Sequence, residues 1–135
     1  MSIETVANEI RDEFEFLDDW EARYSHIIDL GKANPPLEAD ERTETNRVRG
    51  CASQVWMVSE RTKDDRLNIR AESDAAIVSG LIALLLRLFS GQKTTEIGPF
   101  DAAEFLKEIG VAGALTAQRS NGLASMVARI KSDAV

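Results

Sequence analysis

Cysteine and histidine are almost absent from this chain. Its 135 residues contain one cysteine, Cys51, and one histidine, His26. A single cysteine cannot form an internal disulfide, which excludes a small secreted domain stabilised by disulfides. Structural zinc takes four cysteine or histidine ligands and an iron–sulfur cluster needs several thiolates, so neither metal site can be built from these two residues. The sequence also lacks the glycine-rich phosphate-binding motifs and the paired-histidine zinc motif.

Positive charge and long apolar runs are also scarce. The chain has 16 lysine and arginine residues against 23 aspartate and glutamate residues, a formal net charge of -7. No basic patch is visible, so we expect no nucleic-acid partner. The apolar run Leu81–Leu86 is far too short to cross a bilayer, and Met1–Glu4 lacks the basic and apolar parts of a signal peptide. We therefore expect a cytoplasmic protein that does not contact membranes.

The length and composition fit one globular domain. Apolar residues make up 44% and charged residues 29% of the chain, and 135 residues suffice for a self-contained core. The polar stretch Lys32–Asn46 contains Pro35-Pro36 and shows no period, which indicates an ordered surface loop or an extended cover and not a linker. We expect a single domain over residues 1–135.

The spacing of apolar residues predicts helices at both ends of the chain. The central helix, after Ser73 or Asp74 as cap, is apolar nearly all round and should lie in the middle of the fold, where Gly80 would permit close packing. The expected helices are Ile3–Phe16, Trp20–Leu30 with Gly31 as its stop, Ala75–Ser90 with Gly91 as its stop, Asp101–Ile109, and a last helix capped by Thr116.

Two strands lie between these helices. Val55–Glu60 is apolar on both faces at first, which predicts a central strand covered on both sides. Leu67–Glu72 alternates between apolar and polar residues, and the polar turn between the two strands makes them an antiparallel hairpin. Arg47–Arg49 is a weaker third candidate. Helices, a small antiparallel sheet of about three strands and further helices make an α+β fold.

Cys51 is the residue with the most chemistry to offer. It follows Gly50, which permits a tight turn, and lies just before the strand at Val55, in a loop held by a rigid element. The thiolate is the reactive form, and Arg47 and Arg49 could favour it. Two other interpretations stay open at this point. Cys51 can be a small buried hydrophobe, and it can pair with His26 as a Cys–His hydrolase, although His26 falls at the edge of a helical apolar stripe.

Five motifs follow one another along most of the chain. They are Trp20-Glu21-x-Arg23-Tyr24, Leu30-Gly31-Lys32, Gly50-Cys51-x-Ser53-Gln54-Val55-Trp56, Ser73-Asp74-Ala75-x-Ile77-Val78-x-Gly80-Leu81, and Leu115-Thr116-x-Gln118-Arg119-Ser120-Asn121-Gly122-Leu123-x-x-Met126. In this order and spacing they resemble the SufE family of sulfur acceptors. The resemblance extends from about Phe16 to Ile130, and Ala117 stands where such proteins often have proline.

The resemblance implies a fold and a role. The fold would be a small antiparallel sheet packed by helices, similar to the IscU-type scaffold. The protein would take sulfane sulfur from a pyridoxal-phosphate-dependent, SufS-type cysteine desulfurase as a persulfide on Cys51 and stimulate that enzyme. It would then pass the sulfur to a SufBCD-type iron–sulfur cluster scaffold. No metal or cofactor need be bound by the chain itself, and self-association as a homodimer stays open.

The resemblance also assigns roles to single residues. Cys51 would be the catalytic residue, sheltered at rest by Val55, Trp56 and the helix that follows Asp74. Partner contacts would fall at Gly50, Ser53, Gln54 and Arg119. The alternative within the same resemblance is a non-catalytic adaptor or allosteric activator of a desulfurase.

Overall fold

A small antiparallel sheet lies against the helices of this protein. The computed structural model describes residues 2–111 and 116–135. Strand β1 (Val55–Arg61) pairs with β2 (Arg66–Ser73) over its whole length, from Val55 opposite Ser73 to Arg61 opposite Leu67. The two-residue strand β3 (Gln92–Lys93) pairs with the start of β2, which gives the order β1-β2-β3. The predicted α+β fold with its three-stranded antiparallel sheet is confirmed.

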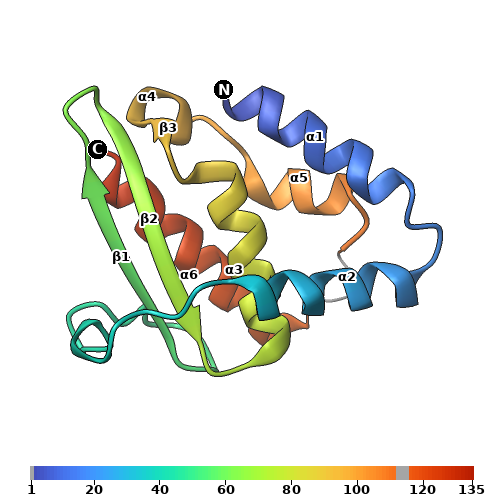
Figure 1. Ribbon diagram of the computed structural model, residues 1–135, viewed down its shortest axis with the longest axis horizontal. Helices are drawn as coiled ribbons and strands as arrows, with labels where there is room; N and C mark the ends of the chain where they lie inside the picture. Colours follow the sequence, from blue (N-terminus) through green and yellow to red (C-terminus); the bar gives the residue numbers. More distant parts are fainter. Residues whose placement is uncertain (1, 112–115) are drawn as a thin grey trace.

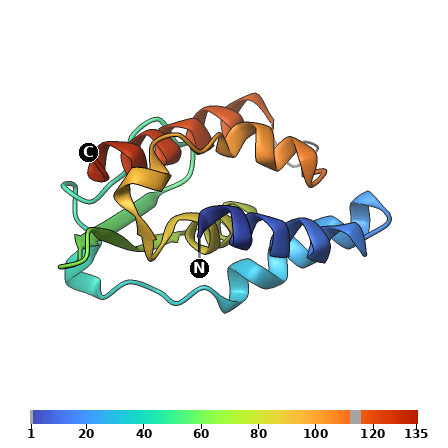
Figure 2. The ribbon, with the colours of Figure 1, turned by 90° about the horizontal axis from the view of Figure 1, so that it is seen from above.

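The helices form layers around α3 (Figure 2). Helices α5 and α6 lie side by side on one side of α3, and α1 and α2 lie on the other (Figures 1 and 2). No helix in the described part of the chain is long and apolar enough to cross a bilayer. The helices are α1 (Ile3–Glu15), α2 (Trp20–Ala33), α3 (Ala76–Phe89), α4 (Thr94–Ile97), α5 (Ala102–Glu108) and α6 (Ala117–Asp133), with a 3-10 turn η1 (Ala39–Glu41).

Helix α3 is buried on almost every side, as its composition predicts. Leu84, Leu85 and Leu88 are at most 1% exposed. The predicted close packing at Gly80 is confirmed, because a Cβ there would collide with the backbone carbonyl of Ile27 in α2. Gly31 of α2 lies at the same crossing of the two helices, and a Cβ added there would lie 2.6 Å from the backbone nitrogen of Gly80.

Helix α2 ends later than predicted and buries few of its side chains. Gly31 does not stop this helix, which continues to Ala33, because the glycine serves the close crossing with α3. Ile27 is fully buried, but Trp20 and Tyr24 remain 37% and 38% exposed. Helix α2 therefore buries a narrow strip against α3 and leaves its aromatic residues at the surface.

The sheet also differs from the prediction in two respects. Strand β1 is an edge strand, not a central one, and its outward residues Trp56 and Val58 are only partly buried. The weak candidate strand at Arg47–Arg49 reduces to one bridge between Arg47 and Trp56, with Val48 N donating to Val55 O at 2.9 Å. This short segment protects part of the free edge of β1.

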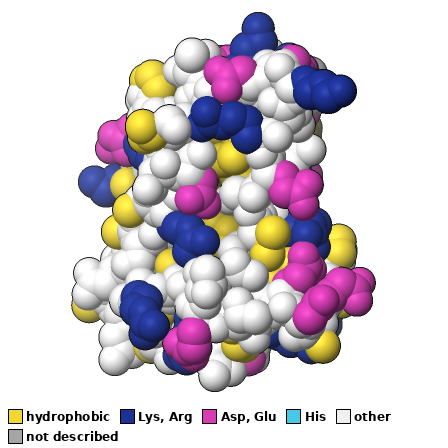
Figure 3. Space-filling view, turned by 90° about the vertical axis from the view of Figure 1, so that its left-hand side faces the viewer, with side chains coloured by type: hydrophobic (Ala, Val, Ile, Leu, Met, Phe, Trp, Pro, Cys, Tyr) yellow, Lys and Arg dark blue, Asp and Glu magenta, His cyan; other side chains and the backbone are white. Residues whose placement is uncertain are grey.

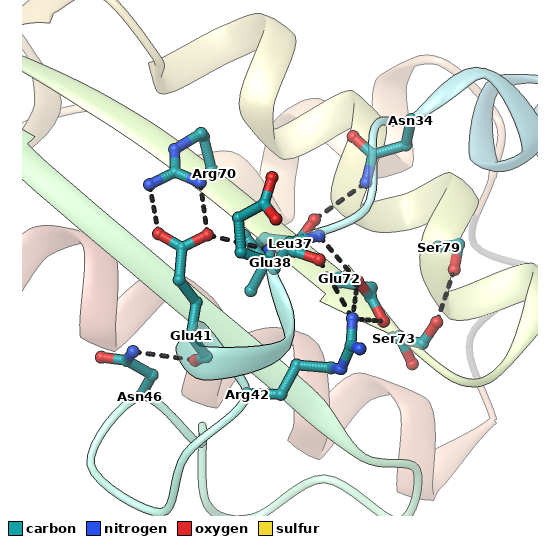
Figure 4. A network of polar contacts seen from close by, with 11 residues as sticks. Asn34, Leu37, Glu38, Glu41, Arg42, Asn46, Arg70, Glu72, Ser73 and Ser79 are labelled. Atoms are coloured by element: carbon teal, nitrogen blue, oxygen red, sulfur yellow. Dashed lines mark hydrogen bonds and ion pairs between the residues drawn. The ribbon is translucent and has the colours of Figure 1, made fainter.

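The polar stretch after α2 covers the outer face of the sheet. Leu37 is buried, and its backbone nitrogen donates to Glu72 of β2 at 2.7 Å. Arg42 donates to the same carboxylate at 3.1 Å, and Glu41 forms a two-point ion pair with Arg70 (Figure 4). The interpretation of this stretch as an extended cover is confirmed, because side chains of β2 hold it at several points.

Charges of both signs are interspersed at the surface. On the face that Figure 3 shows, lysine, arginine, aspartate and glutamate side chains alternate, and no continuous basic area forms there. Most ion pairs join partly exposed side chains, such as Arg66 with Asp64 and Arg61 with Asp65. Exposed pairs of this kind contribute little to stability, so the fold depends chiefly on the apolar layers.

Candidate functional site

The loop that carries Cys51 begins at a left-handed turn and ends at a pair of hydrogen bonds. Gly50 has φ +91°, a left-handed conformation that favours glycine, and a Cβ there would lie 2.5 Å from the hydroxyl oxygen of Ser125 in α6. At the other end, Gln54 N donates to the Asp74 carboxylate at 3.1 Å, and Asp74 N donates to Gln54 O at 3.3 Å. Because Asp74 holds the loop, it does not cap α3; Ala75 is the N-cap and makes no side-chain capping bond.

The sulfur of Cys51 rests against helix α6. Its thiol donates to the carbonyl oxygen of Gly122 at 3.5 Å, the long distance typical of a weak sulfur hydrogen bond. A Cβ at position 122 would lie 3.3 Å from Sγ and 3.5 Å from the Cα of Cys51. Gly122 therefore creates the space that the sulfur occupies. The sequence motif contains Gly122, but only the fold reveals this contact.

The surroundings of Cys51 favour the protonated thiol. The residue is half-buried, and this burial raises the pKa of the Cys51 thiol, while the nearby positive charge of Arg47 opposes the rise. Arg47 therefore lowers the pKa of Cys51, as expected, but by less than burial raises it. At neutral pH the resting sulfur is a neutral thiol, which is a poor nucleophile.

A cavity of about 270 Å³ opens beside the sulfur. Three chain segments form its walls: the Cys51 loop, the start of α3 and the start of α6. Apolar and polar side chains both line it, and Arg119, which is half-buried, is one of the lining residues. The lining residues are Cys51, Ala52, Ser53, Ala75, Ile77, Val78, Leu81, Thr116, Gln118, Arg119, Gly122 and Met126.

Most of the site residues expected from the sequence meet at this cavity. Cys51, Ser53 and Arg119 line it, although residues 53 and 119 are far apart in the sequence. Gly50 forms the turn before it, and Gln54 is exposed and lies outside the lining. The predicted cap at Thr116 is confirmed, since its hydroxyl accepts from Arg119 N at 3.2 Å. Leu115, the first residue of that motif, lies outside the described residues.

The expected shelter for the sulfur is right in one part and wrong in another. The apolar wall comes from Ile77, Val78 and Leu81 of α3, as expected, and from Met126 of α6. Val55 and Trp56 do not line the cavity, because the strand that carries them runs away from the loop with Val55 turned into the core. The last helix supplies the second wall, and the sequence does not show how close it comes.

His26 lies in a different environment. Its Nε2 is 3.1 Å from the Glu13 carboxylate, and its ring meets Phe14 edge-on at a centroid distance of 5.2 Å. His26 is half-buried, as the prediction of a boundary position requires, and it is absent from the lining of the Cys51 cavity. The fold therefore provides no histidine beside the thiol, which the hydrolase interpretation needs. Within residues 2–111 and 116–135, no group of three or more His, Cys, Asp or Glu residues is placed to hold a metal ion.

Comparisons with known proteins agree with this site and fold. Residues 8–134 match the family described as "SufE: Fe-S metabolism associated domain". An uncharacterized SufE-like protein of Rhizobium meliloti (strain 1021) is 47% identical over 133 residues, which cover 96% of this chain and 95% of that protein. An uncharacterized SufE-like protein of Rhizobium etli is 48% identical over 130 residues, which cover 94% of this chain and 88% of that protein.

A solved structure supports the fold independently. The solution structure of a hypothetical protein from Thermus thermophilus superposes with a TM-score of 0.77 at 17% identity, covering 96% of this chain and 93% of that one. At such low identity the likeness concerns the fold alone. The match of the family over nearly the whole chain and the identity to the two rhizobial proteins establish the rest: this chain belongs to the SufE family and has a role in Fe-S metabolism.

Proposed function

We propose that this chain acts in the cytoplasm as a single sulfur-acceptor domain, with Cys51 as its reactive residue. The Cys51 thiolate attacks the outer sulfur of a cysteine persulfide on a pyridoxal-phosphate-dependent desulfurase. A new sulfur–sulfur bond forms on Cys51, the donor's sulfur–sulfur bond breaks, and the donor cysteine leaves as a thiolate that takes up a proton. The exchange needs no outside oxidant or reductant. The sulfur then passes to a scaffold for iron–sulfur clusters.

The observation that carries this proposal is the placement of the Cys51 sulfur. It lies half-buried at an apolar cavity, and the three chain segments around it are those that resemble the family's motifs. A persulfide in open solution is exposed to reductants, whereas a sulfur in this cavity, whose lining includes Ile77, Val78 and Met126, is partly shielded from water. The cavity of about 270 Å³ leaves room for one added sulfur atom.

The resting geometry also implies that the loop must move for transfer. The thiol is bonded to Gly122 O and burial raises its pKa, so sulfur in this position is not activated for attack. Release of the Gly50–Gln54 loop would break this contact and bring the sulfur into water, where the thiolate forms more readily. The left-handed turn at Gly50 and the exposed Gln54 are the points about which such a movement would occur.

The surface around the cavity is the proposed contact with the desulfurase. We assign partner contacts to Gly50, Ser53, Gln54 and Arg119, with a SufS-type desulfurase as the donor and a SufBCD-type scaffold as the acceptor. Arg119 supports this assignment because it is half-buried and lines the same cavity as the thiol. There a guanidinium can bind a partner carboxylate or favour the Cys51 thiolate once the loop has moved.

Mass spectrometry tests the proposal directly. After incubation with the cognate desulfurase and free cysteine, the chain should gain one sulfur atom, roughly 32 Da, on Cys51. The gain should disappear on treatment with a thiol reductant and be absent from Cys51→Ser. An unmodified chain after a complete desulfurase reaction would contradict sulfur transfer.

Cys51→Ser also separates transfer from mere activation. A sulfur acceptor loses its stimulation of desulfurase turnover when the thiol is replaced, because the donor persulfide is no longer discharged. A non-catalytic adaptor keeps that stimulation. Full stimulation by Cys51→Ser would therefore identify the chain as an allosteric activator.

A further inference from the structure

A surface hollow of about 440 Å³ lies where helices α1 and α2 meet the end of α5. Its volume is that of a small-molecule site, for which roughly 300 to 1,000 Å³ is usual. It shares no lining residue with the cavity beside Cys51. We call it the α1–α5 hollow and define it by its charged side chains and the glycine at its end, which are Arg11, Asp12, Glu15, Arg23, Glu108 and Gly110.

Arg23 lines this hollow as a half-buried cation without a partner among the described residues. Arginines make every ion pair in the described part of the chain except the one at His26, but Arg23 makes none. Its Nε is buried and has no hydrogen-bond partner, and the rest of its guanidinium donates to no described residue. A guanidinium has five N–H donors in a planar fork that matches a carboxylate. Arg23 therefore brings to the hollow donors that the described structure does not use.

The guanidinium of Arg23 packs against the turn that ends α5. Gly110 has φ +78°, and a Cβ added there would lie 3.1 Å from Cζ and 3.2 Å from Nε and Nη1 of Arg23. The absent side chain of this glycine thus gives the guanidinium its place. Arg23 also belongs to the motif Trp20-Glu21-x-Arg23-Tyr24, no residue of which lines the Cys51 cavity. The fold places this arginine at the hollow and does not pair it with a carboxylate.

The second arginine of the hollow, Arg11, is already paired. Its Nε donates to Glu108 at 2.8 Å, its Nη1 donates to Asn8 at 2.7 Å, and its guanidinium lies 5.2 Å from the centre of the Phe105 ring. The ion pair joins α1 to the last residue of α5, so it connects two walls of the hollow. Because Arg11 and Glu108 neutralise each other, neither of them requires a ligand.

Two carboxylates of the hollow have no partner. Asp12 and Glu15 are exposed on α1, and neither side chain forms an ion pair or a hydrogen bond in the described part of the chain. Beside the Arg11–Glu108 pair, the hollow therefore presents one positive and two negative groups, and Arg23 is not paired with either carboxylate. The two carboxylates repel a simple anion and Arg23 repels a simple cation. A ligand with both charges finds a partner for each.

We propose that the α1–α5 hollow binds a free α-amino acid as its zwitterion. The carboxylate of the ligand accepts from Arg23, in the charge-assisted pairing that arginine forms through parallel hydrogen bonds. The ammonium group of the ligand donates to Asp12 and Glu15. An α-amino acid carries both charged groups on one carbon, which suits a hollow whose opposite charges line one small space without pairing. This ligand site is separate from Cys51.

Titration of the natural chain with L-alanine, followed by NMR, tests the inference. Alanine has no thiol, so Cys51 takes no part. Backbone amides of residues 11–15, 23 and 108–110 should shift and saturate with a Kd on the order of 1 mM, which is within reach of a ligand of so few atoms. Shifts that never saturate, or that fall on other parts of the chain, would overturn the inference.

Three related molecules show whether both charges of the ligand are needed. Acetate has only the carboxylate, and methylammonium and alaninamide have only the cationic group. At equal ionic strength each should bind at least about tenfold more weakly than alanine, because each leaves one side of the hollow without a partner. Acetate or alaninamide that binds as tightly as alanine would refute a zwitterion site.

Arg23→Gln tests the partner assigned to the carboxylate. It should weaken alanine binding at least about tenfold and leave the weak binding of alaninamide unchanged, because alaninamide has no carboxylate to lose. A mere loss of packing at Gly110 would weaken both ligands alike and would contradict the assignment. Lys63→Gln, which removes an exposed positive charge in the turn between β1 and β2, is the matched control and should bind alanine normally.

The double change Asp12→Asn and Glu15→Gln tests the other side of the hollow and does not depend on how well Arg23→Gln folds. Both positions are exposed, so the fold should persist. Alanine binding should weaken at least about fivefold, whereas acetate should bind more tightly because two repelling charges are gone. Glu9→Gln, an exposed position on α1 outside the hollow, is the control. Unchanged alanine binding in the double variant would overturn the inference. These titrations contain no desulfurase, so their outcome is independent of the proposed sulfur transfer.

Discussion

Gly122 and Cys51 form a contact that depends on the absence of one side chain. The helix carbonyl at 122 accepts the thiol proton, and the missing Cβ gives the sulfur its place. A carbonyl oxygen stabilises a thiol and repels a thiolate, so the same contact shelters the sulfur and keeps it unreactive. The residue that governs access to Cys51 is therefore a glycine on another element.

Gly122→Ala should drive the Cys51 sulfur out of its resting place. A methyl group 3.3 Å from Sγ is a few tenths of an ångström too close, and we expect the loop to shift before helix α6 does. We expect alkylation of Cys51 by iodoacetamide at pH 7 to be several-fold faster, while stability changes little because alanine suits a helix interior. Asn121→Ala, on an exposed neighbouring position, is the control. An unchanged alkylation rate would show that the sulfur does not rest against α6.

Cys51 should also make stability depend on alkaline pH. Burial holds its pKa above the value in the unfolded chain, so the folded state retains the proton more strongly. The resulting stabilisation is complete below the unfolded pKa and is lost as pH rises through the folded pKa. Urea unfolding from pH 7 to 10 should show this alkaline loss for the natural chain and a smaller one for Cys51→Ser. Equal pH dependence in the two proteins would exclude a raised pKa.

At the scale of elements, strand β2 fastens the cover segment Leu37–Asn46 through two ion pairs. Glu72 binds Leu37 N and Arg42, and Arg70 binds Glu41 (Figure 4). The ion pair with Arg70 lowers the pKa of Glu41 to about 2. Its stabilising effect is present above the ordinary glutamate pKa and is lost as pH falls toward 2, so this end stays fastened throughout the neutral range.

Glu72→Gln should loosen the cover segment without unfolding the protein. The amide can still accept from Leu37 N, but it cannot form the ion pair with Arg42. Hydrogen exchange at residues 37–46 should become faster, with a loss of stability of about 1 kcal/mol or less, as for other partly exposed ion pairs. Glu60→Gln, exposed on β1, serves as the control. Unchanged exchange in Glu72→Gln would mean that apolar burial of Leu37 alone holds the segment.

The long elements follow from local patterns, and the short ones do not. Helical periodicity predicts α1, α3 and α6, and alternation predicts the β1–β2 hairpin, because these patterns repeat over many residues. Strand β3 has two residues and α4 has four, too few for any period to show.

Predictions of helix caps and helix stops are wrong where the residue makes a tertiary contact instead. Asp74 is a good helix cap by type, but its carboxylate binds Gln54 N across the fold. Gly31 is a good helix stop by type, but it lies inside α2 at the crossing with Gly80. The candidate site shows the same division. Cys51 and Arg119 stand in recognisable motifs, whereas the contact with Gly122 depends on where α6 packs and the absence of Val55 from the cavity depends on the direction of β1.

At the scale of the whole molecule, α3 joins the two outer layers and forms a wall of the site. It lies between α1 and α2 on one side and α6 on the other (Figure 2), and most of its residues are buried. Ile77, Val78 and Leu81 at its start line the Cys51 cavity, and Gly80 in the same turns meets Ile27 of α2. The position of the cavity wall is thus set by the crossing of α2 and α3.

Gly80→Ala should therefore disturb both stability and the site. The new methyl group would overlap the backbone carbonyl of Ile27, and neither helix backbone can yield without moving a whole layer. The gain in helix propensity is about 1 kcal/mol, while overpacking costs typically 1 to 3 kcal/mol; because backbone is involved here we take the upper end of that cost and expect a net loss of about 2 kcal/mol. Thermal unfolding measures this loss.

Gly98→Ala is the matched control, since a Cβ there meets nothing within 4 Å, and it should unfold at nearly the same temperature as the natural chain. In the Gly80→Ala chain that remains folded, displacement of α3 should also speed Cys51 alkylation. A Gly80→Ala protein as stable as the Gly98→Ala control would show that the two helices can separate freely, and the cavity wall would then not depend on their crossing.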